Sequence, residues 1–233
     1  MSTIACIFAR AGSKGIPNKN IRSFNGKPLI TWTIEMALKV KVIDQIYVST
    51  DSEEIANVAR SAGAIVPFLR PKELASDESP EWLSWQHFLM YLKNSMGELP
   101  EIFLSLPTTS PLRSINDIEK CVNEFKKGKA DMVLGVTQSN RSPYFNMVTK
   151  DGKNSLSLVI DEGRQFVRRQ DTPEIFDLTT ACYVGKPTFI LEKGSIFEGR
   201  VVGVEIPSER ALDIDTLLDF QIAEFLHKSM GLS

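Results

Sequence analysis

Residues 4–20 read IACIFARAGSKGIPNKN, and this stretch decides the fold. Its first five residues are apolar and end abruptly in a loop that carries glycines and the cations Arg10, Lys14 and Lys19. Such an apolar run is typical of a buried central strand, and open α/β sheets bind ligands beyond the C-terminal ends of their strands. Because glycines let the backbone approach an anion and the cations can act from two sides, we interpret the loop as a phosphate-binding site. The alternative is a basic surface loop.

The spacing of the loop glycines, Gly12 and Gly15, is informative about the class of nucleotide site. Neither G-x-x-x-x-G-K-[ST] nor G-x-G-x-x-G can be written over the loop. The spacing therefore disfavours a P-loop ATPase and a dinucleotide-dependent dehydrogenase.

The composition is that of an ordinary globular chain. Its 233 residues are 42% hydrophobic and 24% charged, with a net charge of -2. There is no basic excess to hold a nucleic acid by counterion release, so we expect no nucleic-acid partner. The sequence has no apolar run of about 18 residues and no signal-peptide pattern at its start. We therefore expect no membrane span and a cytoplasmic protein.

The few cysteines and histidines restrict the metal chemistry. Cys6, Cys121 and Cys182 lie far apart in predicted strands and helices, which indicates reduced core thiols. Only two histidines are present. Any metal should therefore be held by carboxylates, which favours Mg²⁺, Mn²⁺ or Ca²⁺.

Strand and helix patterns alternate along most of the chain. This alternation predicts an α/β fold with a mostly parallel sheet flanked by helices. Asp51 is interpreted as a helix cap in preference to a catalytic acid. Predicted strands cover residues 4–8, 45–49, 64–69, 102–106, 132–136, 181–184 and 201–206, and predicted helices cover 28–40, 51–62, 79–96, a segment capped by Ser114, and 216–230.

The helical rhythm is lost from about residue 137 to 180, where short strands at 144–148, 155–160 and 166–167 are separated by turn sequences. We interpret this segment as a small β-rich lobe inserted into a single domain that covers residues 1–233.

Asp213 and Asp215 stand between the last predicted strand and the last predicted helix. An Asp-x-Asp pair in an extended segment places both carboxylates on one side of the chain, where they can share a hard cation. The alternative is that Asp215 only caps the helix and Asp213 is solvated. The apolar Leu212 and Ile214 favour a fixed pair.

Six segments, in order, resemble the acylneuraminate cytidylyltransferase family, the CMP-sialic acid or CMP-nonulosonate synthetases. They are residues 9–20, 49–52, 69–77, 109–113, 169–170 and 213–216. The resemblance covers nearly the whole chain. It implies a Rossmann-like nucleotidyltransferase, a homodimer formed through the lobe, and a reaction in which CTP and a nonulosonic acid give a CMP-sugar and pyrophosphate.

The resemblance also implies roles for individual residues. Lys14, Lys19, Asp213 and Asp215 would be the catalytic groups, and the two aspartates would carry Mg²⁺ or Mn²⁺. The triphosphate and cytidine would be bound by Arg10, Ser13, Lys14, Lys19, Asn20, Arg70, Ser76 and Asp77, and the sugar by Thr108, Thr109, Ser110, Arg169 and Gln170.

Two departures from the family pattern fall on the sugar side. Pro107-Thr108 replaces a Gln-Pro pair, and Thr179-Thr180-Ala181 replaces Asn-Gly-Ala. The acceptor therefore stays open between N-acetylneuraminic, legionaminic and deaminated neuraminic acid. A cytidylyltransferase for an eight-carbon 3-deoxy sugar acid and a non-catalytic nucleotide-binding subunit are the alternatives.

Overall fold

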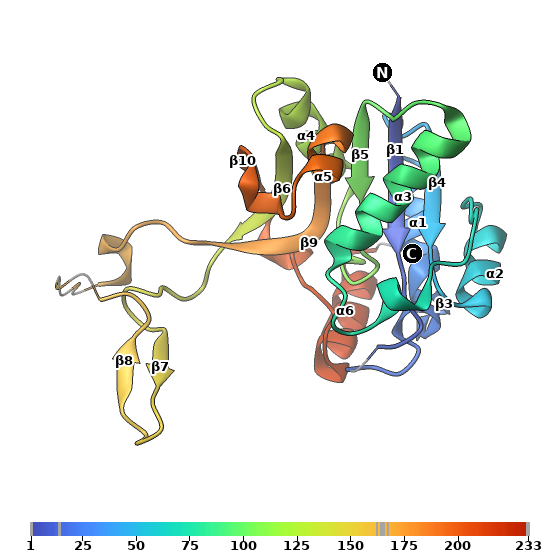
Figure 1. Ribbon diagram of the computed structural model, residues 1–233. Coiled ribbons are helices and arrows are strands. Elements are labelled where there is room, and N and C mark those ends of the chain that lie inside the picture. The colour runs from blue at the N-terminus through green and yellow to red at the C-terminus, as the bar shows by residue number, and fades with distance from the viewer. Residues whose placement is uncertain (1, 14, 162, 164–165, 167, 232–233) are drawn as a thin grey trace.

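A computed structural model describes residues 2–13, 15–161, 163, 166 and 168–231. Its centre is a six-stranded sheet with the order β10-β6-β9-β5-β1-β4 (Figure 1). All neighbours pair in parallel except β9, which is antiparallel to both β5 and β6. The predicted α/β class with a mostly parallel sheet is confirmed. The strands are β1 (Thr3–Phe8), β4 (Gln45–Ser49), β5 (Ile102–Ser105), β6 (Met132–Gln138), β9 (Phe176–Gly185) and β10 (Val201–Glu205).

Strand β1 is buried because helices cover both faces of the sheet. Ala5 and Ile7 face one core cluster, and Ile4 and Cys6 face another, as expected for side chains that alternate along a strand. The first cluster includes side chains of α1 (Leu29–Ala37), α2 (Glu53–Ser61) and α4 (Ile115–Lys126), and the second includes side chains of α3 (Glu81–Met96) and α5 (Pro187–Glu192).

The last helix, α6 (Leu217–Ser229), packs in a third cluster with the segment that follows β1. Phe220 of α6 and Ile214 share this cluster with Ile16 and with Phe24 of the short hairpin β2 (Ser23–Phe24) and β3 (Lys27–Pro28). Residues from the two ends of the sequence are thus held together by apolar packing.

Two helix caps were predicted, and one of them was assigned to the wrong residue. Ser114 caps α4 in a capping box with Asp117, as predicted. The cap of α2 is Ser52, whereas Asp51 accepts a hydrogen bond from the Ala11 amide at 2.9 Å. The predicted Asp51 cap is therefore wrong by one residue, because the neighbouring serine supplies the oxygen.

The predicted strand at 64–69 is also wrong. Only isolated bridges join Tyr47 to Ile65 and Thr50 to Leu69. Pro67 lies between the two bridges, and a proline has no amide hydrogen to donate to a strand ladder.

Between β6 and β9 the chain leaves the sheet and carries the hairpin of β7 (Val148–Lys150) and β8 (Leu156–Leu158) away from the helices (Figure 1). The strand predicted at 144–148 is wrong in its first part, because residues 143–146 form a turn closed on the Ser142 carbonyl. Phe166 lies outside any strand, and Val167 lies outside the described residues.

The three cysteines are buried and free of disulfides, as predicted. Within the described part of the chain, no helix combines the length and the apolarity that crossing a membrane requires.

Candidate active site

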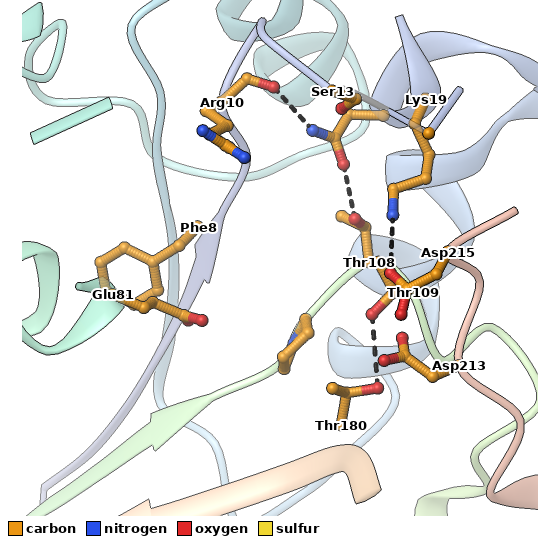
Figure 2. Close-up of a pocket in the computed structure, with 13 residues that line it drawn as sticks. Phe8, Arg10, Ser13, Lys19, Glu81, Thr108, Thr109, Thr180, Asp213 and Asp215 are labelled. Carbon is orange, nitrogen blue, oxygen red and sulfur yellow. Dashed lines mark hydrogen bonds and ion pairs between the residues drawn. The ribbon is translucent and has the colours of Figure 1, made fainter. Parts of the chain in front are cut away.

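A pocket of about 370 Å³ opens at the C-terminal ends of β1 and β5 (Figure 2). This is the edge at which a parallel sheet presents its loops to a ligand. The lining residues are Phe8, Arg10, Ser13, Gly15, Lys19, Asn20, Glu81, Pro107, Thr108, Thr109, Thr180, Asp213 and Asp215.

The loop after β1 and the Asp-x-Asp segment touch each other in this pocket. Lys19 Nζ donates a hydrogen bond to the Ile214 carbonyl at 2.5 Å and lies 3.7 Å from Asp215 Oδ1 (Figure 2). Only 13% of the Lys19 side chain is exposed, compared with 76% of the Asp215 side chain. Gly15 lies so close that a Cβ there would sit 2.1 Å from the Asp215 carbonyl oxygen. This glycine therefore makes room for the protein backbone. The predicted residue Lys14 lies outside the described residues.

The Asp-x-Asp segment is fixed on several sides. The Ile214 amide donates to the Thr109 carbonyl at 2.9 Å, and the Ile214 side chain is fully buried. Thr216 caps α6 in a capping box with Asp219, so the cap is not Asp215. The buried Oδ1 atom of Asp213 has no hydrogen-bond partner among the described residues.

A salt bridge just before this segment ties it to α4. Arg210 donates from Nε and Nη2 to the two carboxylate oxygens of Asp117 at 2.8 and 3.0 Å. Burial alone would raise the pKa of Asp117, but hydrogen bonds from Arg210 and Ser114 lower it below its ordinary value. The pair thus fixes the start of the segment that carries Asp213.

The loop between β5 and α4 forms another wall of the pocket. Asn20 bridges it to the first loop: its amide donates to the Arg10 carbonyl at 2.9 Å and accepts from Thr108 Oγ1 at 2.5 Å. The Ser110 and Thr180 hydroxyl oxygens lie 2.6 Å apart.

Arg113 holds this loop from behind. Its buried guanidinium donates to the carbonyl oxygens of Pro107, Ser110 and Ala181. Burial lowers the pKa of Arg113 to about 10.

A second cavity of about 250 Å³ shares Phe8, Arg10 and Glu81 with the first. Its wall includes the predicted residues Arg70, Ser76 and Asp77. The Arg10 guanidinium forms an ion pair with Asp77 at 2.5 Å.

Arg70 is the buried cation of this second cavity. It is 5% exposed and donates from Nη1 to Ser84 Oγ at 3.1 Å. Its Nε has no partner among the described residues, and burial lowers its pKa. The described protein atoms therefore leave part of the hydrogen-bonding capacity of the Arg70 guanidinium unused.

Arg169 and Gln170 lie elsewhere. They belong to the 3₁₀ helix η3 (Arg169–Asp171) in the lobe and line a different cavity, together with Ser139 and Ser142. Arg169 donates to the Ser139 carbonyl. The structure does not bring these two residues to the pocket of their own chain.

Sequence reasoning missed Glu81. An acidic residue in the first turn of a helix is common because it interacts favourably with the helix dipole, so its position alone does not indicate a site. The Glu81 carboxylate faces both cavities. Desolvation raises its pKa, although hydrogen bonds from Trp85 and Ser105 and the charge of Arg70 oppose the shift.

A family model described as cytidylyltransferase matches residues 4–223. The chain belongs to the cytidylyltransferase family. The predicted resemblance is therefore confirmed, and the protein is a nucleotidyltransferase.

Similar proteins match this cytidylyltransferase over all or nearly all of its length. It is 37% identical to post-translational flagellin modification protein B of Campylobacter coli and 36% identical to CMP-N,N'-diacetyllegionaminic acid synthase of Campylobacter jejuni, with 100% of this chain and 98% of each relative covered. It is 31% identical to N-acylneuraminate cytidylyltransferase of Streptococcus agalactiae, over 94% of this chain and 52% of that protein.

A solved structure of CMP:2-keto-3-deoxy-manno-octonic acid synthetase complexed with CTP matches with a TM-score of 0.72, covering 99% of this chain and 100% of that one. The identity is 15%, so this likeness establishes the shared fold alone.

Replacing Gly15 by Ala tests the contact between the two segments. The new Cβ would overlap the Asp215 carbonyl, so we expect the Asp-x-Asp segment to shift and pyrophosphate release to fall about 10-fold or more, since small displacements at a reacting site are costly. Gly152→Ala in the lobe is the control, because no atom lies within 4 Å of its added Cβ. Equal rates of pyrophosphate release for the two variants would show that the contact between Gly15 and Asp215 does not position the site.

Replacing Arg210 by Met leaves a buried Asp117 carboxylate without its cation. We expect the free energy of unfolding at pH 7 to fall by about 2–3 kcal/mol, below the usual cost for a fully buried pair because Arg210 is partly exposed. The folded-state pKa of Asp117 is lowered, so its stabilisation is present above its unfolded pKa and is lost as the pH falls through the folded value. Urea unfolding at pH 7 and about pH 3 measures this.

The loss of stability caused by Arg210→Met should be smaller at the lower pH. The exposed Arg200→Met is the matched control and should change stability little at either pH. A deficit of the same size at both pH values would show that the ion pair is not its source.

Proposed function

We propose that this cytidylyltransferase transfers CMP from CTP to the anomeric 2-hydroxyl of a nonulosonic acid in a Mg²⁺-dependent reaction that releases pyrophosphate. The observation that carries the proposal is the single pocket lined by the cationic loop after β1 and by the two aspartates. The acceptor class is supported by the relatives named for diacetyllegionaminic, pseudaminic and N-acylneuraminic acids, all of which are nine-carbon sugar acids.

The two cavities match the two ends of CTP. Arg10, Ser13 and Lys19 would bind the triphosphate, with Lys14 as a further cation from outside the described residues. Arg70 Nε offers a buried, unused donor to a carbonyl acceptor on the cytosine ring. Ser76 and Asp77 would complete the cytidine site.

The aspartates fit a hard divalent cation. Asp213 Oδ1 is buried without a partner in the described part of the chain, which is costly unless a ligand or ion satisfies it. Within that part, no three acidic, His or Cys side chains form a cluster that could hold a metal, so substrate oxygens and water would supply the other ligands. When bound, Mg²⁺ would neutralise charge on the phosphates.

The chain's own groups would position the reactants and stabilise charge. Lys19, tethered to the Ile214 carbonyl, holds an ammonium group at a fixed place beside the aspartates. Fixed cations of this kind stabilise the negative charge that develops in phosphoryl transfer. Thr108 and Thr109, which line the pocket, would face the sugar. Ser110 is fully buried beside Thr180 and would support this wall from behind. We assign no general base.

We further propose that the chain is a single domain, with the 137–180 lobe inserted, and that it forms a homodimer in which each lobe reaches the pocket of the other copy. The lobe projects from the helices and sheet (Figure 1). Exposed large apolar side chains are numerous in this segment, and such gatherings are typical of surfaces that become buried in an interface. They are Phe145, Met147, Val148, Leu156, Val159, Phe176 and Leu178. Arg169 and Gln170 would meet the sugar, because an Arg fork suits a carboxylate.

Pyrophosphate release from CTP, Mg²⁺ and a panel of acceptors tests the reaction. We expect turnover with at least one of N-acetylneuraminic, legionaminic and deaminated neuraminic acid, and weaker turnover with an eight-carbon 3-deoxy sugar acid. Turnover with the eight-carbon acid alone would support the alternative acceptor class. CTP binding without any turnover would indicate a non-catalytic subunit.

Asp213→Asn and Asp215→Asn are the variants for the same assay. Each should lower the rate by about 100-fold or more, since each removes charge from the proposed metal site. Asp177→Asn on the exposed start of β9 is the control and should act like the parent protein. Near-normal activity in one aspartate variant would remove that residue from the site.

Mixing two inactive variants tests the arrangement in trans. Lys19→Ala damages the pocket and Arg169→Ala damages the lobe, so each alone should be inactive. If lobes cross between copies, refolding an equal mixture restores about a quarter of the sites, because half of the dimers are mixed and each has one intact site. If each lobe served its own chain, every site in the mixture would carry one of the two substitutions, so no recovery would be seen.

A further inference from the structure

Glu81 is the first residue of α3, and its carboxylate is held in one orientation. Oε1 accepts hydrogen bonds from Trp85 Nε1 at 3.0 Å and from Ser105 Oγ at 3.3 Å. Trp85 and Ser105 are almost fully buried and belong to two different elements, α3 and β5. The protein therefore fixes the rotamer of this acid.

The other carboxylate oxygen is left unused. Oε2 of Glu81 has no hydrogen-bond partner within the described part of the chain. Neighbouring groups desolvate the carboxyl and raise its pKa, and Asp213 adds repulsion. Glu81 is exposed to solvent at the opening of the two cavities. A ligand that enters them must replace the hydration of this oxygen with a hydrogen-bond donor of its own, or lose affinity. A bound ligand is the natural source of that donor.

The position of Glu81 decides which part of a ligand it meets. It lies where the two cavities join, beside Phe8 and Arg10. On one side, Lys19 and the aspartates line the phosphate end, and Figure 2 shows them across the pocket from Glu81. On the other side, Arg70 supplies donors for the base. The group that joins the base to the phosphates in CTP is the ribose.

From this geometry we infer that Glu81 determines specificity for the sugar of the nucleotide, by accepting a hydrogen bond from the 2'- or 3'-hydroxyl of the CTP ribose. The inference rests on the proposed function. It follows from the chemistry of the two partners: ribose hydroxyls are donors, and a carboxylate oxygen is a strong acceptor.

The test compares the affinity of CTP with that of 2'-deoxy-CTP and 3'-deoxy-CTP by calorimetry, in the presence of Mg²⁺ and without an acceptor. The parent protein should bind CTP about 10- to 100-fold more tightly than at least one deoxy analogue, as expected for a hydrogen bond to a charged group. Glu81→Gln should weaken CTP binding and leave the affinity for that analogue nearly unchanged. In Glu81→Gln, the ratio of the affinity for CTP to the affinity for that deoxy analogue should then fall to about threefold or less.

Glu78→Gln is the matched control, because Glu78 is exposed in the loop just before α3 and lines neither cavity. Gln keeps the size of the side chain and can still accept from Trp85, so the variant should fold. Two results would overturn the inference: no preference for CTP over either analogue in the parent protein, or an unchanged ratio in Glu81→Gln. A parent protein that binds no CTP would instead overturn the proposed function.

Discussion

The contact between the first loop and the last connecting segment is the constraint on which the site depends. Lys19 donates to the Ile214 carbonyl, and the backbone of Gly15 lies against that of Asp215. Residues far apart in the chain are joined here, with a sequence separation of 195 for the lysine bond. This contact joins the cations directly to the segment that carries the acids, and Ile214 anchors the segment in the apolar cluster that also holds Ile16.

Much of the fold could be predicted from periodicity, because its strands are buried on both faces. A short apolar run that ends in a turn, such as that of β1, is typical of a strand covered by helices on either side. The errors arose where local chemistry offered two solutions. Ser52 and Asp51 are both good capping residues, and the structure uses one as the cap and the other to hold the Ala11 amide. Pro67 interrupted a segment whose other residues favour a strand.

The site could be predicted only as far as parallel topology dictates it. The C-terminal ends of parallel strands meet at one edge, so a loop after β1 and a loop after β5 had to be neighbours. Glu81 and Arg113 could not be found in this way, because their roles depend on hydrogen bonds to distant elements. Arg169 and Gln170 show the converse: the sequence motif associates them with the sugar, and one chain alone places them in another cavity.

Unsatisfied polar atoms give the two cavities their chemical meaning. Arg70 Nε, Ser79 Oγ and Asp213 Oδ1 are buried without partners in the described residues, and all three residues line these cavities. Each such atom costs about 1–3 kcal/mol of stability, which most folds avoid. The Arg70 guanidinium donor lies in one cavity and the Asp213 carboxylate acceptor in the other, and the carboxylate of Glu81 lines both. These groups lower the stability of the free protein, and they lie along the two joined cavities. A polar ligand with a carbonyl, hydroxyls and metal-bound phosphates would satisfy them.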